Sequence, residues 1–235
     1  MTLLALAIAP GLIICFYIFY KDMYNPEPKS KLLISFILGA TVVIPAGLIE
    51  QAFTPYLSNS IQSTALFAFG VVALTEEAGK FLVLRYYAYP RASFDEPLDG
   101  IVYSIMVGMG FATVENIFYV YSHGYGTAVL RMFLSVPAHA TFAVLMGFYM
   151  GKAKFDPLHS GPLMLTGLFL AIFFHGTFDF FLFLQNTPDV KPYVSDGLLF
   201  LGAVVSFIIA IRLSRKLIRQ HQFLSQQTFN AARNA

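Results

Sequence analysis

The sequence predicts an all-α integral membrane protein, a bundle of about seven transmembrane helices with its N-terminus outside and its C-terminus in the cytosol. The composition, the length of the apolar blocks and the placement of the basic residues each point to it. Of 235 residues, 57% are hydrophobic and only 12% are charged, whereas soluble domains carry about 25% charged residues. A soluble fold could not bury so much apolar surface, so we expect lipid to surround this chain.

Seven apolar blocks approach the roughly 20 residues that a helix needs to cross the hydrocarbon core. They are continuous rather than alternating, which disfavours a β-barrel. The blocks are Leu3–Tyr20, Leu32–Phe53, Ile61–Tyr87, Ile101–Tyr121, Ala128–Met150, Pro162–Leu184 and Val194–Leu213. We therefore expect one transmembrane helical domain over residues 1–214 and a polar, frayed cytosolic tail over residues 215–235.

Lysine and arginine occupy alternate connections between these blocks. The first, third and fifth connections and the segment after the last block carry them, the second and fourth carry none, and the sixth has only Lys191. Basic residues mark cytosolic connections. The alternation predicts the stated orientation and independently supports seven spans. The bilayer is thus an expected partner, while a formal charge of +2 gives no reason to expect nucleic acid.

Polar residues lie inside the spans, where exposure to lipid would be costly. They are Glu76, Glu77, Lys80, Glu115, Asn116, His139, His175 and Asp179. Each ionised residue at a helix centre costs about 2.5–3.5 kcal/mol, so the five acidic and basic groups would cost about 12–18 kcal/mol, comparable with the whole stability of a fold. These groups must pair, bind an ion or face water. Glu50 and Arg131 lie nearer helix ends, where a long side chain reaches the interface cheaply.

Spacing indicates which of these groups can cooperate. Residues four apart share a helix face, so Glu76 faces with Lys80 and His175 with Asp179. Counting about 1.5 Å per residue from the cytosolic ends puts four of the spans' acids and imidazoles at roughly 15–22 Å depth. Pro137 should also free a backbone carbonyl one turn before it and open the helix near His139.

The residue types leave several chemistries open. A carboxylate beside an imidazole can take a proton from water, and Glu76, Glu115, His139 and His175 could instead hold a divalent metal such as zinc. Either route gives a membrane hydrolase that acts on a peptide or a lipid. The same inventory would also suit a proton- or cation-coupled transporter. A non-catalytic membrane protein is the structural alternative. In it, Glu76 and Glu77 would only form ion pairs with Lys80, and Asp179 would only orient His175 by a hydrogen bond.

Four ordered motifs resemble the PrsW intramembrane proteases, relatives of the CAAX prenyl endopeptidase and bacteriocin-immunity superfamily. Glu76-Glu77-Ala78-Gly79-Lys80 matches EExxK, and Gly110 to Asn116 is similar to GFAxxEN. His139 follows on the next span, and His175 to Asp179 is similar to HxxxD. Asp99-Gly100 continues the likeness, which spans roughly Thr75–Phe180. In the CAAX relatives the second motif is FxxxH. Here the residue four positions after Phe111 is Glu115 instead of a histidine.

The resemblance implies a multi-pass protease of the bacterial inner membrane that makes the first cut in a membrane-spanning anti-sigma factor. Its functional residues would be Glu76, Glu77, Lys80, Glu115, Asn116, His139, His175 and Asp179.

We expect an activated water as nucleophile, because the hydroxyls of Ser135 and Thr141 are ordinary in membrane helices. Glu76 or Glu77 would be the general base and His139 would position the water. His175, oriented by Asp179, would stabilise the oxyanion or bind metal, Lys80 would pair with the glutamates, and Asn116 would donate a hydrogen bond to the substrate or the oxyanion.

Overall fold

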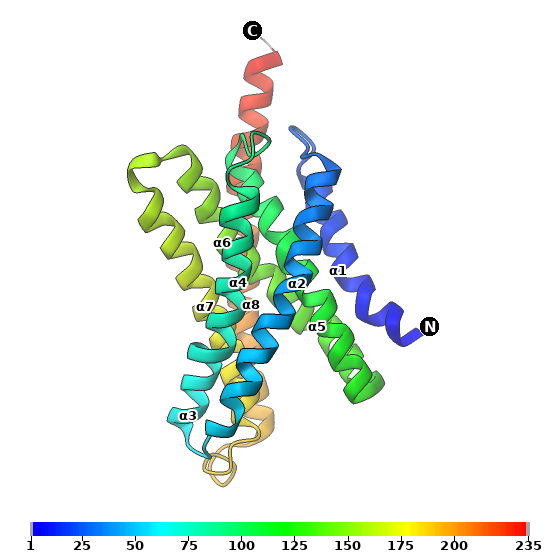
Figure 1. Ribbon diagram of the computed structural model, residues 1–235, viewed down its shortest axis with the longest axis vertical. Helices are drawn as coiled ribbons and strands as arrows, with labels where there is room; N and C mark the ends of the chain where they lie inside the picture. The colour runs from blue at the N-terminus through cyan, green and yellow to red at the C-terminus, as the bar shows by residue number, and fades with distance from the viewer. Residues whose placement is uncertain (1, 234–235) are drawn as a thin grey trace.

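The computed structural model describes residues 2–233, which form helices and connections without any strand (Figure 1). The elements are α1 (Thr2–Lys21), α2 (Lys29–Phe53), η1 (Thr54–Tyr56), α3 (Ile61–Ala65), η2 (Leu66–Ala73), α4 (Leu74–Val83), η3 (Leu84–Ala88), α5 (Pro97–Phe133), α6 (Ser135–Phe155), η4 (Pro157–His159), α7 (Ser160–Leu184) and α8 (Asp196–Arg233). The predicted all-helical class is confirmed.

Five helical segments are long and apolar enough to cross a membrane. They are Leu3–Lys21, Lys29–Tyr56, Pro97–Phe155, Pro157–Leu184 and Asp196–Arg233. The third of these is 59 residues long and contains both α5 and α6. The helical stretch from α3 to η3 is not among the five, and it carries Glu76, Glu77 and Lys80. The chain is therefore a multi-pass membrane protein.

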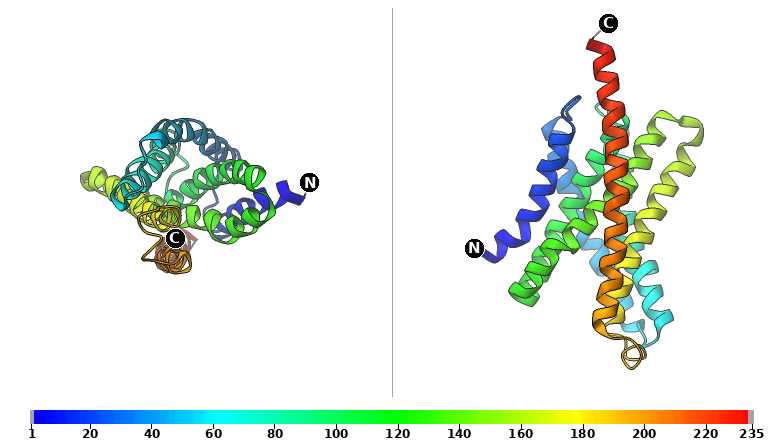
Figure 2. Two further views of the ribbon diagram at one scale, coloured as in Figure 1. Left: turned by 90° about the horizontal axis from the view of Figure 1, so that it is seen from below. Right: turned by 180° about the vertical axis from the view of Figure 1, so that it is seen from behind.

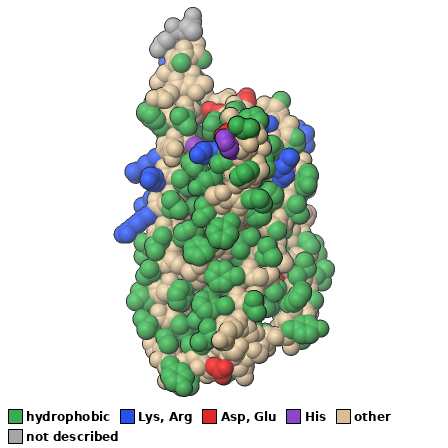
Figure 3. Space-filling model, turned by 90° about the vertical axis from the view of Figure 1, so that its left-hand side faces the viewer, with side chains coloured by type: hydrophobic (Ala, Val, Ile, Leu, Met, Phe, Trp, Pro, Cys, Tyr) green, Lys and Arg blue, Asp and Glu red, His purple; other side chains and the backbone are tan. Residues whose placement is uncertain are grey.

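The outer surface of the bundle is apolar around its middle. Side chains such as Ile13, Phe16 and Leu66 are 66–72% exposed, and Figure 3 shows hydrophobic groups over most of one face with Lys and Arg gathered toward one end. A water-soluble monomer rarely exposes so large a contiguous apolar area. Lipid chains account for this surface, as the composition predicts.

Glycines let the central helix α5 approach its neighbours at backbone distance. A Cβ added at Gly39 of α2 would clash with the Val107 carbonyl of α5. A Cβ at Gly100 would clash with backbone atoms of Gly147 and Gly151 in α6. Because the beginning of α5 meets the end of α6, these two helices run antiparallel. Small residues four apart allow this close approach in membranes.

The chain reverses inside α5, within the predicted connection 122–127 between two apolar blocks. Gly124 has φ +78°, a left-handed conformation that glycine adopts without steric cost. A second break lies at Leu134, between α5 and α6. Pro137, which cannot donate to the carbonyl four residues earlier, accounts for it. The predicted block Ala128–Met150 is therefore not one straight helix.

Helix α8 runs along the whole bundle and extends beyond it at one end (Figure 2). It continues to Arg233, so residues 215–233, which we expected to fray, are helical, and residues 234–235 of the predicted tail lie outside the described residues. Leu217, Ile218, His221 and Ser225 are buried against other helices. The beginning of the predicted tail thus packs on the bundle.

The packing of α2 on α5 can be tested with two alanine substitutions in the same helix. Gly39→Ala forces α2 away from the Val107 carbonyl, and overpacking of this kind costs about 1–3 kcal/mol. Gly47→Ala is the matched control, because a Cβ at Gly47 has no neighbour within 4 Å. We expect thermal unfolding in detergent, followed by circular dichroism, to show a lower melting temperature for Gly39→Ala only. Equal melting temperatures would contradict the close approach.

Candidate active site

Helix α4 brings both motif glutamates and the lysine into the bundle. Glu76, Glu77 and Lys80 are each at most 4% exposed. The flanking elements η2 and η3 are π-helical, and such wide turns are frequent at functional sites. A π-turn contains one residue more than an α-turn, so it changes the direction of the side chains that follow. The π-turns that flank α4 thus help to set the direction in which Glu76, Glu77 and Lys80 point into the bundle.

The ammonium group of Lys80 lies at the centre of the site. Its Nζ is 3.1 Å from Oε2 of Glu76 and 2.8 Å from Oε1 of Glu77. It is also 3.4 Å from Nδ1 of His139 and 3.9 Å from the centroid of the Phe111 ring. One positive charge thus contacts two carboxylates, an imidazole and an aromatic face. The predicted pairing of Lys80 with both glutamates is present.

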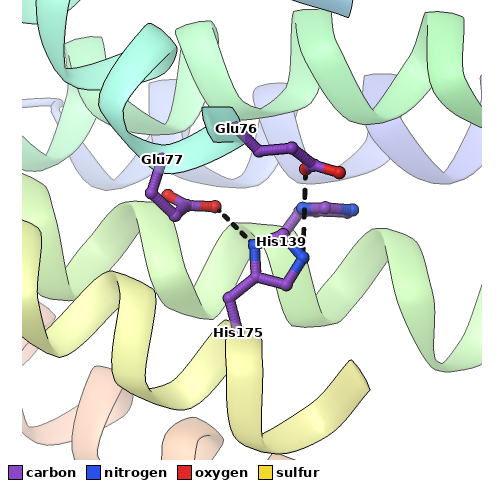
Figure 4. A group of neighbouring side chains, drawn as sticks. All are labelled: Glu76, Glu77, His139 and His175. Atoms are coloured by element: carbon purple, nitrogen blue, oxygen red, sulfur yellow. Dashed lines mark hydrogen bonds and ion pairs between the residues drawn. The ribbon is translucent and has the colours of Figure 1, made fainter. Parts of the chain in front are cut away.

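His175 of α7 faces carboxylates through both ring nitrogens. Nδ1 lies 2.8 Å from Oε1 of Glu77 and Nε2 lies 3.1 Å from Oδ2 of Asp179. Nε2 is 3.9 Å from Oε2 of Glu76, and Figure 4 shows His175 between the two glutamates. The ring stacks on Phe142, with centroids 4.9 Å apart. His175 is therefore fixed in orientation from three sides.

A second group connects α5 with α6. Nε2 of His139 lies 3.0 Å from Oε2 of Glu115, and Nη2 of Arg131 donates to the same oxygen at 2.6 Å. In a straight helix, residues 115 and 131 would be about 24 Å apart along the axis. Their contact is possible because the chain reverses at Gly124. Arg131 is thus the partner of Glu115 and not a side chain that reaches lipid headgroups. The glycines at 124 and 126 were the sequence signal for the turn that brings the two residues together.

Asn116 does not point toward a reacting group. Its Nδ2 donates to the Ala7 carbonyl of α1 at 2.9 Å, and its Oδ1 accepts from Nε of Arg131 at 2.9 Å. The side chain is fully buried. The amide therefore connects α1 with Arg131, and Asn116 is not among the residues that line the cavity described below.

A cavity of about 660 Å³ opens onto this layer of the bundle. Five of the eight expected site residues line it, namely Glu76, Glu115, His139, His175 and Asp179. Glu50 and Arg131 line it as well, although we expected their side chains to reach the membrane interface. Glu77 and Lys80 stand behind the cavity wall. Of the two motif glutamates, only Glu76 faces the space that a substrate and water can enter.

Four side chains fit a divalent metal ion. Glu76, Glu77, His139 and His175 each offer one ligand atom, and these atoms lie within 4.8 Å of one another. Two carboxylates and two imidazoles suit zinc. Glu115, which we expected as a ligand, is not in this group because it pairs with Arg131 and His139. Lys80 shares the same two carboxylates.

Known proteins resemble the chain over the region that holds this site. The model of the PrsW family intramembrane metalloproteases matches residues 27–213. Protease PrsW of Geobacillus kaustophilus is 40% identical over 181 residues, which is 77% of this chain and 80% of the relative. Protease PrsW of Bacillus subtilis is 38% identical over 182 residues (77% and 83%), and that of Clostridioides difficile is 34% identical over 192 residues (79% and 81%). No solved structure matches the chain.

Every residue of the candidate site falls within the matched range, and its EExxK, GFAxxEN and HxxxD segments meet in one buried cluster beside a cavity. The family match covers most of the chain and several relatives exceed 30% identity over more than two thirds of it. The chain belongs to the PrsW family of intramembrane proteases.

Proposed function

We propose that this chain is an endopeptidase that hydrolyses a peptide bond of a membrane-spanning protein with a water molecule activated by Glu76. One observation carries this assignment. Glu76 is the motif glutamate that lines the cavity, and His139, His175 and Asp179 line the same cavity. Oε2 of Glu76 accepts from Lys80, while Oε1 receives no hydrogen bond from the residues that the structure describes. Oε1 is therefore the free base.

The steps follow from these contacts. Glu76 takes a proton from water while the hydroxide adds to the scissile carbonyl carbon, and His139 orients the water. His175 is held at Nδ1 by Glu77, and its Nε2 donates to the oxyanion alongside Oδ2 of Asp179, which lies 3.1 Å from the same nitrogen. Glu76 then gives its proton to the leaving amide nitrogen as the carbon–nitrogen bond breaks. Asp179 holds His175, and Arg131 holds Glu115 against His139.

The same site accommodates a metal-assisted form of the reaction. Glu76, Glu77, His139 and His175 would hold the ion, which would supply a more acidic bound water. Lys80 competes with any cation for both carboxylates, because its Nζ already lies within hydrogen-bond distance of each. The effect of metal removal on cleavage therefore distinguishes the metal-assisted mechanism from the metal-free one.

A membrane-spanning anti-sigma factor in the bacterial inner membrane is the substrate class that we propose. The family membership supports a protein substrate, and the Bacillus-type relatives support the location. A site lined by charged residues and placed within an apolar bundle suits a substrate that is itself embedded in lipid.

Substitution of Glu76 tests the base. Glu76→Gln keeps the size of the side chain and removes the proton acceptor, so we expect cleavage to fall by about 10²–10⁴-fold. His175→Ala should fall similarly, because it removes the oxyanion donor. Purified variants in detergent, incubated with candidate single-span proteins, give the rates. Asp156→Asn, at an exposed connection, is the control that should cleave like the unsubstituted chain.

A chelator added to the same assay distinguishes the two mechanisms. Loss of cleavage in chelator and its return with zinc would assign a metalloprotease, while full cleavage in chelator would assign glutamate-activated water. Unchanged cleavage in both Glu76→Gln and His175→Ala would place the reaction elsewhere. Ion-dependent flux without cleavage would favour a transporter.

The ion pair between Glu115 and Arg131 gives a second test. Arg131→Met leaves a buried carboxylate without its cation, which should lower the stability by about 1–3 kcal/mol and slow cleavage through His139. Glu115→Gln combined with Arg131→Met removes both charges and should recover most of the melting temperature but not the cleavage. A double variant no more stable than Arg131→Met alone would show that the pair is not coupled.

We also propose seven passes, with the N-terminus outside and residues 215–235 on the cytosolic side. The continuous helical stretch from α3 to η3 and the antiparallel pair α5 and α6 support this count, and the alternating basic connections support the orientation.

Cysteine accessibility tests this topology. In a Cys15→Ser background, we expect Ser58→Cys to react with an impermeant maleimide in intact cells. Lys152→Cys should react only after permeabilisation. Both side chains are exposed. The reverse pattern would invert the proposed topology.

A further inference from the structure

A second cluster of acids lies far from the active site. Asp22 follows the end of α1, and Glu96 and Asp99 lie at the beginning of α5. Asp99 and Glu115 belong to the same helix and are 16 residues apart, about 24 Å along its axis. Each of the three carboxylates offers one oxygen, and these oxygens lie within 4.8 Å of one another. No step of the proposed proteolysis uses them.

Backbone N–H groups donate to each of the three carboxylates and hold one of its two oxygens. Oδ2 of Asp99 accepts from the N–H groups of Asp95 and Glu96, both at 2.8 Å. Oδ2 of Asp22 accepts from the N–H of Glu27 at 2.9 Å, and the side chain of Glu96 accepts from the N–H of Asp99 in a capping box. The three groups are therefore held in place without any side-chain cation.

The other oxygen of each carboxylate has no hydrogen-bond partner in the described part of the chain. Oδ1 of Asp22, Oε1 of Glu96 and Oδ1 of Asp99 are sealed from solvent and make no hydrogen bond within residues 2–233. The side chains are 0%, 7% and 0% exposed. Nor does an ion pair join any of them to Lys, Arg or His in the part of the chain that the structure describes. An unpartnered buried carboxylate oxygen costs several kcal/mol, so three together call for a ligand.

Helix α8 adds further buried polar side chains beside the cluster. Ser225 and His221 share a face of α8 and are at most 2% exposed. Nδ1 of His221 has no hydrogen-bond partner within residues 2–233, and the Ser225 hydroxyl lies beside Glu96. Burial raises the pKa of Glu96, and the neighbouring Ser225 hydroxyl partly offsets the rise. Glu27 is already engaged, because Tyr103 donates to its Oε2. The cluster thus faces three segments, the end of α1, the beginning of α5 and α8.

We propose that Asp22, Glu96 and Asp99 bind one hard divalent cation of the Mg²⁺ or Ca²⁺ class. An all-oxygen set of carboxylates is what these ions prefer, and either ion completes its shell with water or a hydroxyl such as Ser225. The cation neutralises three like charges and ties α1 to the first turn of α5. The site is structural, because it lies about 24 Å from the cavity layer.

The alternative to a cation is bound protons. Burial raises the pKa of Asp22 to about 7, the backbone hydrogen bond from Glu27 lowers it, and the nearby carboxylates raise it further. In that case the acids would carry protons and the cluster would not bind divalent ions. The experiment must therefore measure bound cation directly.

The test uses the full chain in detergent, stripped with chelator, in a Glu76→Gln, His175→Ala background that disables the histidine-containing group. Mn²⁺ is titrated and bound Mn²⁺ is measured by electron paramagnetic resonance, with Mg²⁺ and Ca²⁺ as competitors. We expect about one Mn²⁺ per chain, and a loss of affinity of about 10-fold or more in Asp22→Asn and Asp99→Asn. Asp95→Asn is the matched control, because this exposed neighbour lies outside the cluster.

Thermal unfolding guards against variants that simply misfold. Asparagine keeps an oxygen for the backbone N–H groups, so Asp22→Asn and Asp99→Asn should melt no lower than the parent in chelator. Added Mg²⁺ or Ca²⁺ should raise the melting temperature of the parent and of Asp95→Asn only. The proposal is overturned by absence of bound Mn²⁺ in the background variant, or by equal binding in all three asparagine variants. A parent whose melting temperature does not rise when Mg²⁺ or Ca²⁺ is added would also overturn it.

Discussion

The ammonium of Lys80, placed between Glu76 and Glu77, is the interaction on which the rest of the site depends. Two adjacent carboxylates in the middle of a membrane protein would otherwise repel each other without water to screen them. Removing one partner from a buried pair costs about 3–5 kcal/mol. Lys80 also contacts His139 and the Phe111 ring, so the same cation connects α4 with α5 and α6. Helix α7 joins through His175, which is bound to Glu77.

This arrangement gives the two glutamates different environments. Glu77 is enclosed by Lys80 and His175 and serves to orient them, whereas Glu76 shares Lys80 but faces the cavity. A similar separation holds on α5, where Glu115 reaches the cavity and Asn116 is engaged by Ala7 and Arg131. Adjacent residues on a helix point about 100° apart, so each motif supplies one group to the reaction space and one to its support.

Much of this could be predicted from the sequence, because a charge inside an apolar block is costly and motif spacing sets which side chains share a face. The helical class, the pairing of Lys80 with both glutamates and the contact of His175 with Asp179 follow from those rules. The pairing of Glu115 with Arg131 does not, since spacing within one span cannot show which side chains of two successive spans face each other. Helical periodicity also fixes relative but not absolute directions, so it could not tell Glu76 from Glu77 or show that Asn116 faces α1.

The place of the cavity bears on how a substrate is chosen. It lies beside Glu76 within the bundle, and inside an intact helix each peptide carbonyl is already hydrogen-bonded. The segment must therefore unwind locally before it is cut. Helix-weakening residues such as glycine or proline near the scissile bond would lower that cost, and the enzyme would select among membrane proteins by the strength of their helices as much as by their side chains.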